Sequence, residues 1–217
     1  MQKNIDTTLA QIKSRELGDS EIQALLQDIR NAIKENPASA KELGQHIYLI
    51  NKAVREQPVA VDVNLPPVAG GFIAIGHKPG GKLPFDGLKK IGITVIITLL
   101  QESEGAAAIG QQTEKAGMQW LWFPFSASIT HIHDLSALSN FLKQVQQLLA
   151  SGEKLYLHCS AGIHRTGMMA YAIMRYVGQS REEAKRNLEL LRLVTSQQVG
   201  QERLDWADKV LDEMRPA

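Results

Sequence analysis

Three short, almost wholly apolar runs constrain the fold of this 217-residue chain more than any other feature. They are "GFIAIG" at 71–76, "TVIITLL" at 94–100 and "KLYLHC" at 154–159. A strand that is apolar at nearly every position is buried on both faces, which is typical of parallel sheets covered by helices. The runs therefore predict an interior sheet within a globular domain.

Helical patterns fill most of the sequence between and after these runs. The clearest is an amphipathic stretch from Leu135 to Leu149, which is expected to end at Gly152. Further helices are predicted at 83–91, 103–117, 166–177, 181–192 and 199–213, and further strands at 61–65 ("VDVNL") and 120–125 ("WLWFPF"). Strands that alternate with helices predict an α/β fold, in which a central, mostly parallel sheet is flanked by helices.

Residues 1–58 differ from the rest because they contain helical patterns only. Apolar residues recur at helical spacing within 22–33 and 43–54, and no cluster of reactive side chains accompanies them. We therefore predict an N-terminal helical extension at 1–58, which serves packing or interaction, and a second domain at 59–217. Contact of the N-terminal helices with a partner stays open.

Charge and cysteine content exclude several classes of protein. The net charge is +1, which gives no electrostatic reason to expect a nucleic-acid partner. No run approaches the roughly 18 apolar residues of a membrane span, and the first residues lack the apolar core of a secretory signal. The single cysteine, Cys159, cannot form an internal disulfide, which suits a reducing compartment. A cytoplasmic location is expected, although export without a cleavable signal would leave the same features.

Cys159 lies at the end of an apolar run, where an α/β fold binds ligands. The next residues include Gly162, which lets the backbone curl, and Arg165, whose planar guanidinium matches phosphate. A helix predicted to begin near Thr166 presents N–H groups to an anion. Such electropositive surroundings lower the pKa of a thiol, so Cys159 is predicted to attack phosphorus as a thiolate. The alternative, a buried structural cysteine, does not explain the residues around it.

The segment "HCSAGIHRTG" at 158–167 resembles the His-Cys-x5-Arg-Ser/Thr-Gly signature of the protein tyrosine phosphatase superfamily. The resemblance extends from about residue 60 to 213 and is greatest to small dual-specificity phosphatases of the kinase-associated type. It includes "LKKIGITVIITLLQESE", "GMQWLWFPF" and "SREEAKRNLELLR" in the family's order. It implies a phosphatase catalytic domain at 59–217, with no cofactor and no metal ion, because the loop and its arginine neutralise the phosphoryl charge.

The resemblance also implies a role for each residue of the signature. Cys159 corresponds to the nucleophile that becomes a phosphocysteine, and Arg165 to the arginine that stabilises the transition state. Thr166 is expected to donate to the thiolate, and His158 to orient the loop and help keep the thiolate ionised. The phosphate-binding loop would comprise Ser160, Ala161, Gly162, Ile163, His164 and Arg165.

One expected residue is missing from the sequence. Relatives place an aspartic acid shortly after a Phe-Pro pair, where it protonates the leaving oxygen. Here the sequence reads "FPFSASITHIHDL", and the matching position is Ala127. Asp134, His133 and His131 are the nearby candidates for this acid. Asp134 directly precedes a predicted helix, so its alternative role is that of an N-cap.

Together these features predict a cysteine-dependent phosphatase that works through a phosphocysteine intermediate. Its substrate would be a protein carrying phosphotyrosine or phosphoserine/threonine, or a small phosphate ester. Two alternatives stay open. One is an inositol or lipid phosphate phosphatase, and the other is a phosphate-binding module with low turnover because Ala127 replaces the acid.

Overall fold

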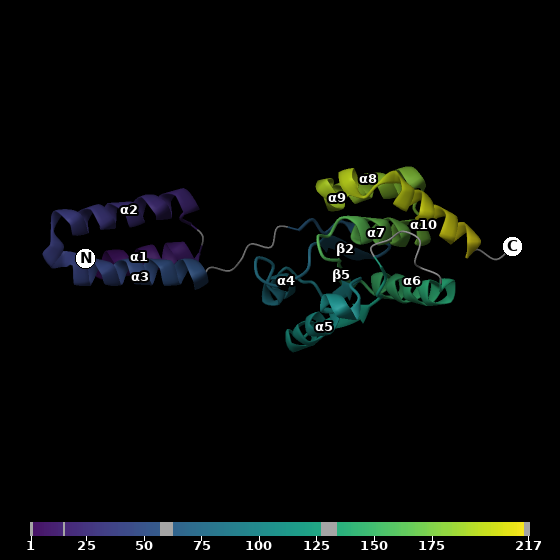
Figure 1. The fold of residues 1–217 in the computed structure, drawn as a ribbon, viewed down its shortest axis with the longest axis horizontal. Coiled ribbons are helices and arrows are strands. Elements are labelled where there is room, and N and C mark those ends of the chain that lie inside the picture. The colour runs from purple at the N-terminus through teal and green to yellow at the C-terminus, as the bar shows by residue number, and fades with distance from the viewer. Residues whose placement is uncertain (1, 15, 57–62, 127–133, 215–217) are drawn as a thin grey trace. The chain divides into compact units, whose positions relative to one another are not determined.

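The computed structural model describes residues 2–14, 16–56, 63–126 and 134–214. The chain forms two compact units, residues 1–59 and 60–217 (Figure 1). No helix among the described residues is both long enough and apolar enough to cross a membrane.

The first unit is built from helices that share a small apolar core. Its elements are α1 (Gln2–Lys13), α2 (Asp19–Glu35), the short 3-10 helix η1 (Pro37–Ser39) and α3 (Ala40–Glu56). α3 contacts both α1 and α2. The buried residues of this core are Ile12, Ile22, Leu26, Ile50 and Ala53. They come from all three long helices, so the first unit has a core of its own.

The second unit contains a five-stranded sheet with the order β1-β2-β5-β3-β4. The strands are β1 (Pro67–Val68), β2 (Gly71–Gly76), β3 (Val95–Thr98), β4 (Gln119–Trp122) and β5 (Lys154–His158). β2, β5, β3 and β4 run parallel, and only the short edge strand β1 is antiparallel. The predicted fold class, a mostly parallel sheet flanked by helices, is confirmed.

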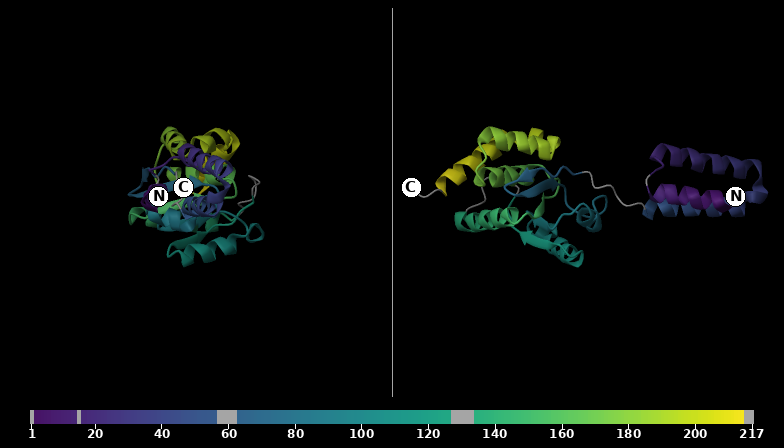
Figure 2. Two further views of the ribbon diagram at one scale, coloured as in Figure 1. Left: turned by 90° about the vertical axis from the view of Figure 1, so that its left-hand side faces the viewer. Right: turned by 180° about the vertical axis from the view of Figure 1, so that it is seen from behind.

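Helices cover the sheet on both faces. They are α4 (Phe85–Lys90), η2 (Glu102–Glu104), α5 (Ala106–Lys115), α6 (Leu135–Ala150), α7 (His164–Tyr176), α8 (Arg181–Leu191), α9 (Leu193–Gln198) and α10 (Gln201–Glu213). α6 and α7 pack on the sheet, and α8 and α10 pack in turn on α7 (Figure 2).

The side chains of the central strands alternate between two apolar cores. Leu155 and Leu157 of β5 belong to the larger core, whereas Tyr156 between them belongs to a smaller core with Leu83, Leu88 and other residues near α4. The strands are apolar at successive positions because both of their faces are buried. This arrangement leaves the carboxyl ends of β2, β5 and β3 side by side, which is where the loop after β5 begins.

The structure corrects three details of the predicted elements. "VDVNL" does not form the first strand: residues 61 and 62 lie outside the described residues, and 63–65 are irregular, with Val63 and Leu65 packed on the smaller core. β1 follows at Pro67, and because proline has no N–H to donate, this strand is confined to the sheet edge. α7 begins at His164 rather than near Thr166, and a separate helix, α9, stands between α8 and α10.

Candidate active site

The loop between β5 and α7 curls tightly at the carboxyl end of the sheet. Gly162 has a φ of +72°, a backbone conformation that side chains with a Cβ rarely adopt. A Cβ on Gly162 would also lie 2.2 Å from the carbonyl oxygen of Gly76 at the end of β2. The Lys78 N–H donates to the Ser160 carbonyl at 3.0 Å, which joins the loop to the segment after β2. Gly162 is therefore required both by its φ and by this close approach.

Cys159 is buried at the start of this loop, with 4% of its surface exposed. Burial by itself raises the pKa of a thiol. Here the nearby Thr166 hydroxyl, the backbone N–H groups of Thr166 and Gly162, and the charge of Arg165 outweigh burial, and the pKa of Cys159 is lowered. The Thr166 hydroxyl is fully buried and makes no hydrogen bond of standard geometry to any described residue. That leaves this hydroxyl free to donate to the sulfur.

His158 belongs to a buried chain of hydrogen bonds that ends at the Cys159 backbone. Its Nδ1 lies 3.0 Å from the Cys159 carbonyl, which can only accept, so Nδ1 carries the hydrogen. Burial lowers the pKa of His158 to about 4, so the neutral ring accepts at Nε2 from the Thr98 hydroxyl at 2.9 Å. Trp120 Nε1 donates in turn to Thr98 at 2.9 Å. A neutral His158 orients the loop without adding positive charge.

Arg165 is held by a bidentate ion pair with Glu104. Nη1 donates to Oε2 at 2.6 Å and Nη2 to Oε1 at 2.7 Å, and Nη1 also lies 3.3 Å from the Phe125 carbonyl. The hydrogen bonds from Arg165 hold the pKa of Glu104 at about 2, and the same pair raises the pKa of Arg165. Arg165 is itself buried, and its guanidinium also interacts with the Cys159 thiol.

Sequence reasoning missed Glu104, although a signal was present. Two acidic residues, Glu102 and Glu104, follow β3 in the 3-10 helix η2, directly beyond the carboxyl end of a central strand. Only the fold shows that Glu104, rather than Glu102, makes the pair with Arg165. Glu104 also accepts from the Gln101 N–H at 2.9 Å, which fixes the carboxylate at the start of η2.

A second arginine, Arg192, contacts the same loop from outside. Its Nη1 donates to the carbonyls of Ala161 and Gly162 at 3.2 and 2.9 Å. Thr195, at 0% exposure, donates from Oγ1 to the Gly162 carbonyl at 2.7 Å. Ser160, Ala161 and His164 are exposed and Ile163 is half-buried, so His164 lies at the rim of the loop.

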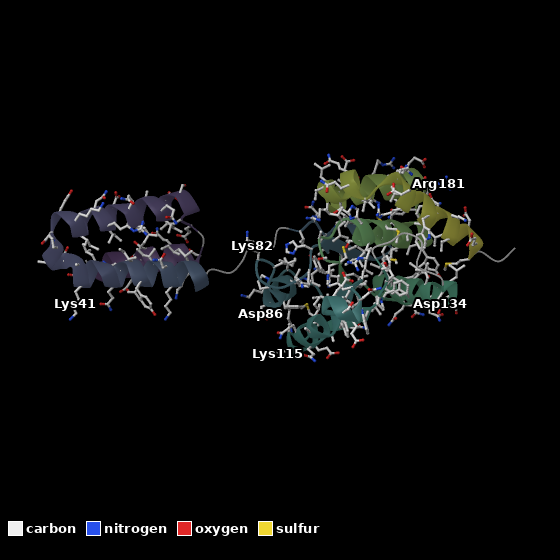
Figure 3. All side chains as sticks on the ribbon, in the orientation of Figure 1. Lys41, Lys82, Asp86, Lys115, Asp134 and Arg181 are labelled. Carbon is white, nitrogen blue, oxygen red and sulfur yellow. The ribbon has the colours of Figure 1, made fainter. Side chains whose placement is uncertain are left out.

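The candidates for the proton donor are only partly described. Asp134 is exposed, lies at the start of α6 (Figure 3) and accepts from the Ala137 N–H at 2.8 Å. This contact is the N-cap that the sequence offered as its alternative role. Ala127, His131 and His133 lie outside the described residues. Within the described parts of the chain, no group of three His, Cys, Asp or Glu side chains is placed to hold a metal ion.

Comparisons with known proteins agree with this geometry. Residues 78–179 match the family model described as a DSP-PTPase phosphatase of polymorphic toxin systems. The structure of kinase associated phosphatase, with serine in place of its catalytic-site cysteine, aligns with a TM-score of 0.58 and 15% identity over 73% of this chain and 97% of that chain.

Two further solved structures are similar. Tk-PTP in its active form gives a TM-score of 0.53 and 19% identity over 67% of this chain and 95% of that one. The human tyrosine phosphatase-like serine/threonine/tyrosine-interacting protein gives 0.51 and 21%, over 69% and 96%. No curated protein matches by sequence.

Proposed function

We propose that the chain is a phosphatase of the dual-specificity type and hydrolyses phosphate monoesters with Cys159 as the nucleophile, because residues 78–179 match a DSP-PTPase family model and the fold is similar to solved phosphatase structures. The observation that carries this proposal is a buried thiol with a lowered pKa, beside a buried arginine at the start of a helix. A structural cysteine would need neither.

The proposed reaction has two steps. The Cys159 sulfur forms a bond to phosphorus while the ester P–O bond breaks, and the leaving oxygen takes up a proton. Water then attacks the phosphocysteine, the S–P bond breaks, and inorganic phosphate leaves with the thiolate restored. Arg165 and the loop N–H groups stabilise the charge on the phosphoryl oxygens in both steps. Thr166 stabilises the sulfur as the leaving group of the second step.

Phosphotyrosine and phosphoserine/threonine in proteins are the proposed substrates. Ala127 stands where relatives carry the acid, so aryl phosphates, whose leaving oxygen needs less protonation, should react faster than alkyl phosphates. The chain should therefore prefer phosphotyrosine peptides to phosphoserine peptides. A phosphoinositide hydrolysed faster than either peptide would instead support the lipid phosphatase alternative.

Hydrolysis of para-nitrophenyl phosphate by wild type, Cys159→Ser and Arg165→Ala tests the proposal. We expect turnover by wild type and its loss in both variants. Wild type that binds a phosphotyrosine peptide without turnover would identify a binding module. Activity that survives Cys159→Ser would show that another group is the nucleophile.

A further inference from the structure

Arg192 and Thr195 form a closed group of hydrogen bonds on the outer side of the loop. Arg192 Nη1 donates to the Ala161 carbonyl at 3.2 Å, to the Gly162 carbonyl at 2.9 Å and to Thr195 Oγ1 at 3.2 Å. Thr195 Oγ1 donates onward to the Gly162 carbonyl at 2.7 Å. Two successive carbonyls of the loop are thus held by two side chains that lie outside the signature sequence.

The planarity of the peptide bond connects these outer contacts to the inside of the loop. In a trans peptide the C=O and the next residue's N–H point in opposite directions. The Ala161 carbonyl shares its peptide with the Gly162 N–H, which is hydrogen-bonded to the Cys159 sulfur. The Gly162 carbonyl likewise shares its peptide with the Ile163 N–H. Holding both carbonyls outward therefore turns both N–H groups inward.

Gly162 is the residue of the loop with the greatest need for such support. Its φ of +72° is accessible without strain because it lacks a Cβ, but glycine also gives the backbone the most freedom to leave that conformation. A peptide flip at this point would aim a carbonyl oxygen, instead of an N–H, at an anion. The two bonds to the Gly162 carbonyl oppose that flip.

The positions of Arg192 and Thr195 are fixed by backbone conformation and by packing. Arg192 stands at the break between α8 and α9 in an extended conformation, with φ −166° and ψ 108°, and its own carbonyl accepts from the Thr195 N–H at 3.0 Å. Thr195 is fully buried against α7, so closely that a Cβ on Gly167 would lie 2.9 Å from Thr195 Cγ2. A backbone hydrogen bond and close packing against α7 therefore hold Thr195 in place, with its hydroxyl directed at the loop.

We propose that Arg192 and Thr195 are positioning residues, which hold the Gly162 and Ile163 N–H groups toward the Cys159 sulfur and toward the phosphoryl group of the substrate. This inference rests on the proposed function of the loop and adds two residues that act through its backbone. Neither side chain needs to touch the substrate for this role.

Alkylation of Cys159 by iodoacetamide across a pH series tests the proposal without requiring turnover. Cys159 is the only cysteine of the chain, so the whole signal reports one thiol. In Thr195→Val and Arg192→Met the apparent thiol pKa should rise by roughly half to one unit. kcat/KM for para-nitrophenyl phosphate should fall about tenfold, because a misaligned donor stabilises the transition state less. Thr195→Ser and Arg192→Lys should restore most of both values.

Arg203→Met is the matched control. Arg203 also donates from Nη1 to a backbone carbonyl, that of Val199 at 3.1 Å, and pairs with Glu202 at 2.6 Å, and both of these partners lie outside the loop. The control should leave the alkylation profile unchanged. Thermal unfolding shows whether each variant is folded, and where Thr195→Val is not, Arg192→Met and its lysine rescue decide.

An alkylation profile that is unchanged in folded Thr195→Val and Arg192→Met would overturn the positioning role, even if wild type hydrolyses the ester. A shifted profile in a chain whose wild type shows no hydrolysis would support the positioning role and contradict the proposed function. The experiment can therefore refute the positioning role without refuting the proposed phosphatase activity, and the reverse.

Discussion

The two ends of α7 each carry an arginine paired with a carboxylate, and the arginine is buried at Arg165 and half-buried at Arg175. The two pairs differ in what else they touch. Arg165, at the start of the helix, pairs with Glu104 and lies beside Cys159. Arg175, in the last turn, donates from Nε to Asp208 at 2.8 Å and from Nη1 to the Gln179 carbonyl. Asp208 also accepts from the Tyr171 hydroxyl at 3.0 Å and pairs with Arg181.

The helix dipole distinguishes the two pairs. A cation is favoured near a helix C-terminus and disfavoured near an N-terminus, so Arg175 is placed with the dipole and Arg165 against it. Asp208 of α10 contacts Tyr171 and Arg175 of α7 and Arg181 of α8. These contacts connect the three helices to one another. Arg165 therefore depends on Glu104 to offset its unfavourable position in the helix dipole, and its position next to a thiol agrees with the proposed role in binding phosphate.

Arg165→Lys should have the largest effect on activity, and it tests the ion pair at the start of α7. Lysine keeps the charge but cannot donate in two parallel bonds to Glu104 and to phosphate. We expect kcat/KM for para-nitrophenyl phosphate to fall by roughly 10³-fold, with the free energy of unfolding changed by only about 1 kcal/mol. Steady-state kinetics and urea unfolding measure both quantities. A variant within tenfold of wild type would refute the proposed role of Arg165.

Asp208→Asn should disrupt the ion pair at the far end of α7. It removes the charge that faces Arg175 and Arg181, and a buried ion pair that loses one partner costs about 3–5 kcal/mol. Urea unfolding should show this loss, whereas kcat/KM of the folded variant should stay within about twofold of wild type. A large drop in kcat/KM without loss of stability would show that the far end of α7 also serves the site.

Glu104→Gln should have an intermediate effect on activity, and it tests what the ion pair with Arg165 contributes to activity and to stability. It leaves Arg165 buried without its charged partner, so kcat/KM should fall about tenfold. The pKa of Glu104 is depressed to about 2 in the folded chain, so the pair stabilises the protein above the ordinary carboxyl pKa and ceases to do so as pH falls through about 2. Urea unfolding of wild type and variant should therefore differ at neutral pH and converge toward pH 2. A difference that persists at pH 2 would contradict the ion-pair explanation.

Thr98→Val should lower activity least among the variants near the loop, and it tests the hydrogen-bond chain that reaches Cys159 through His158. Valine removes the hydroxyl that accepts from Trp120 and donates to His158, and it leaves the half-buried Trp120 and the buried His158 without this partner at a cost of about 1–3 kcal/mol. kcat/KM should fall only about threefold, because the His158 contact with the Cys159 carbonyl remains. Thr98→Ser, which keeps the hydroxyl, is the control and should match wild type in both urea unfolding and kinetics.

Much of the fold followed from local sequence pattern. The apolar runs at 71–76, 94–100 and 154–159 contain β2, β3 and β5, because strands buried on both faces leave an unmistakable pattern. The element that failed was "VDVNL", whose alternation is equally compatible with an irregular segment that packs Val63 and Leu65 on a core. Two prolines directly after it confined pairing to the short edge strand β1.

The sequence by itself determined where the loop lies and which of its residues are the candidates for the site, because Cys159, Gly162 and Arg165 are neighbours along one strand–loop–helix turn. Only the tertiary structure decided what holds that turn. Glu104, Thr98 and Arg192 reach it from other elements, across sequence separations of 61, 60 and 30 residues. Spacing along the chain carries no signal for such contacts. They arise because parallel strands bring their carboxyl ends to one edge of the sheet, where side chains and backbone from separate segments meet around a single loop.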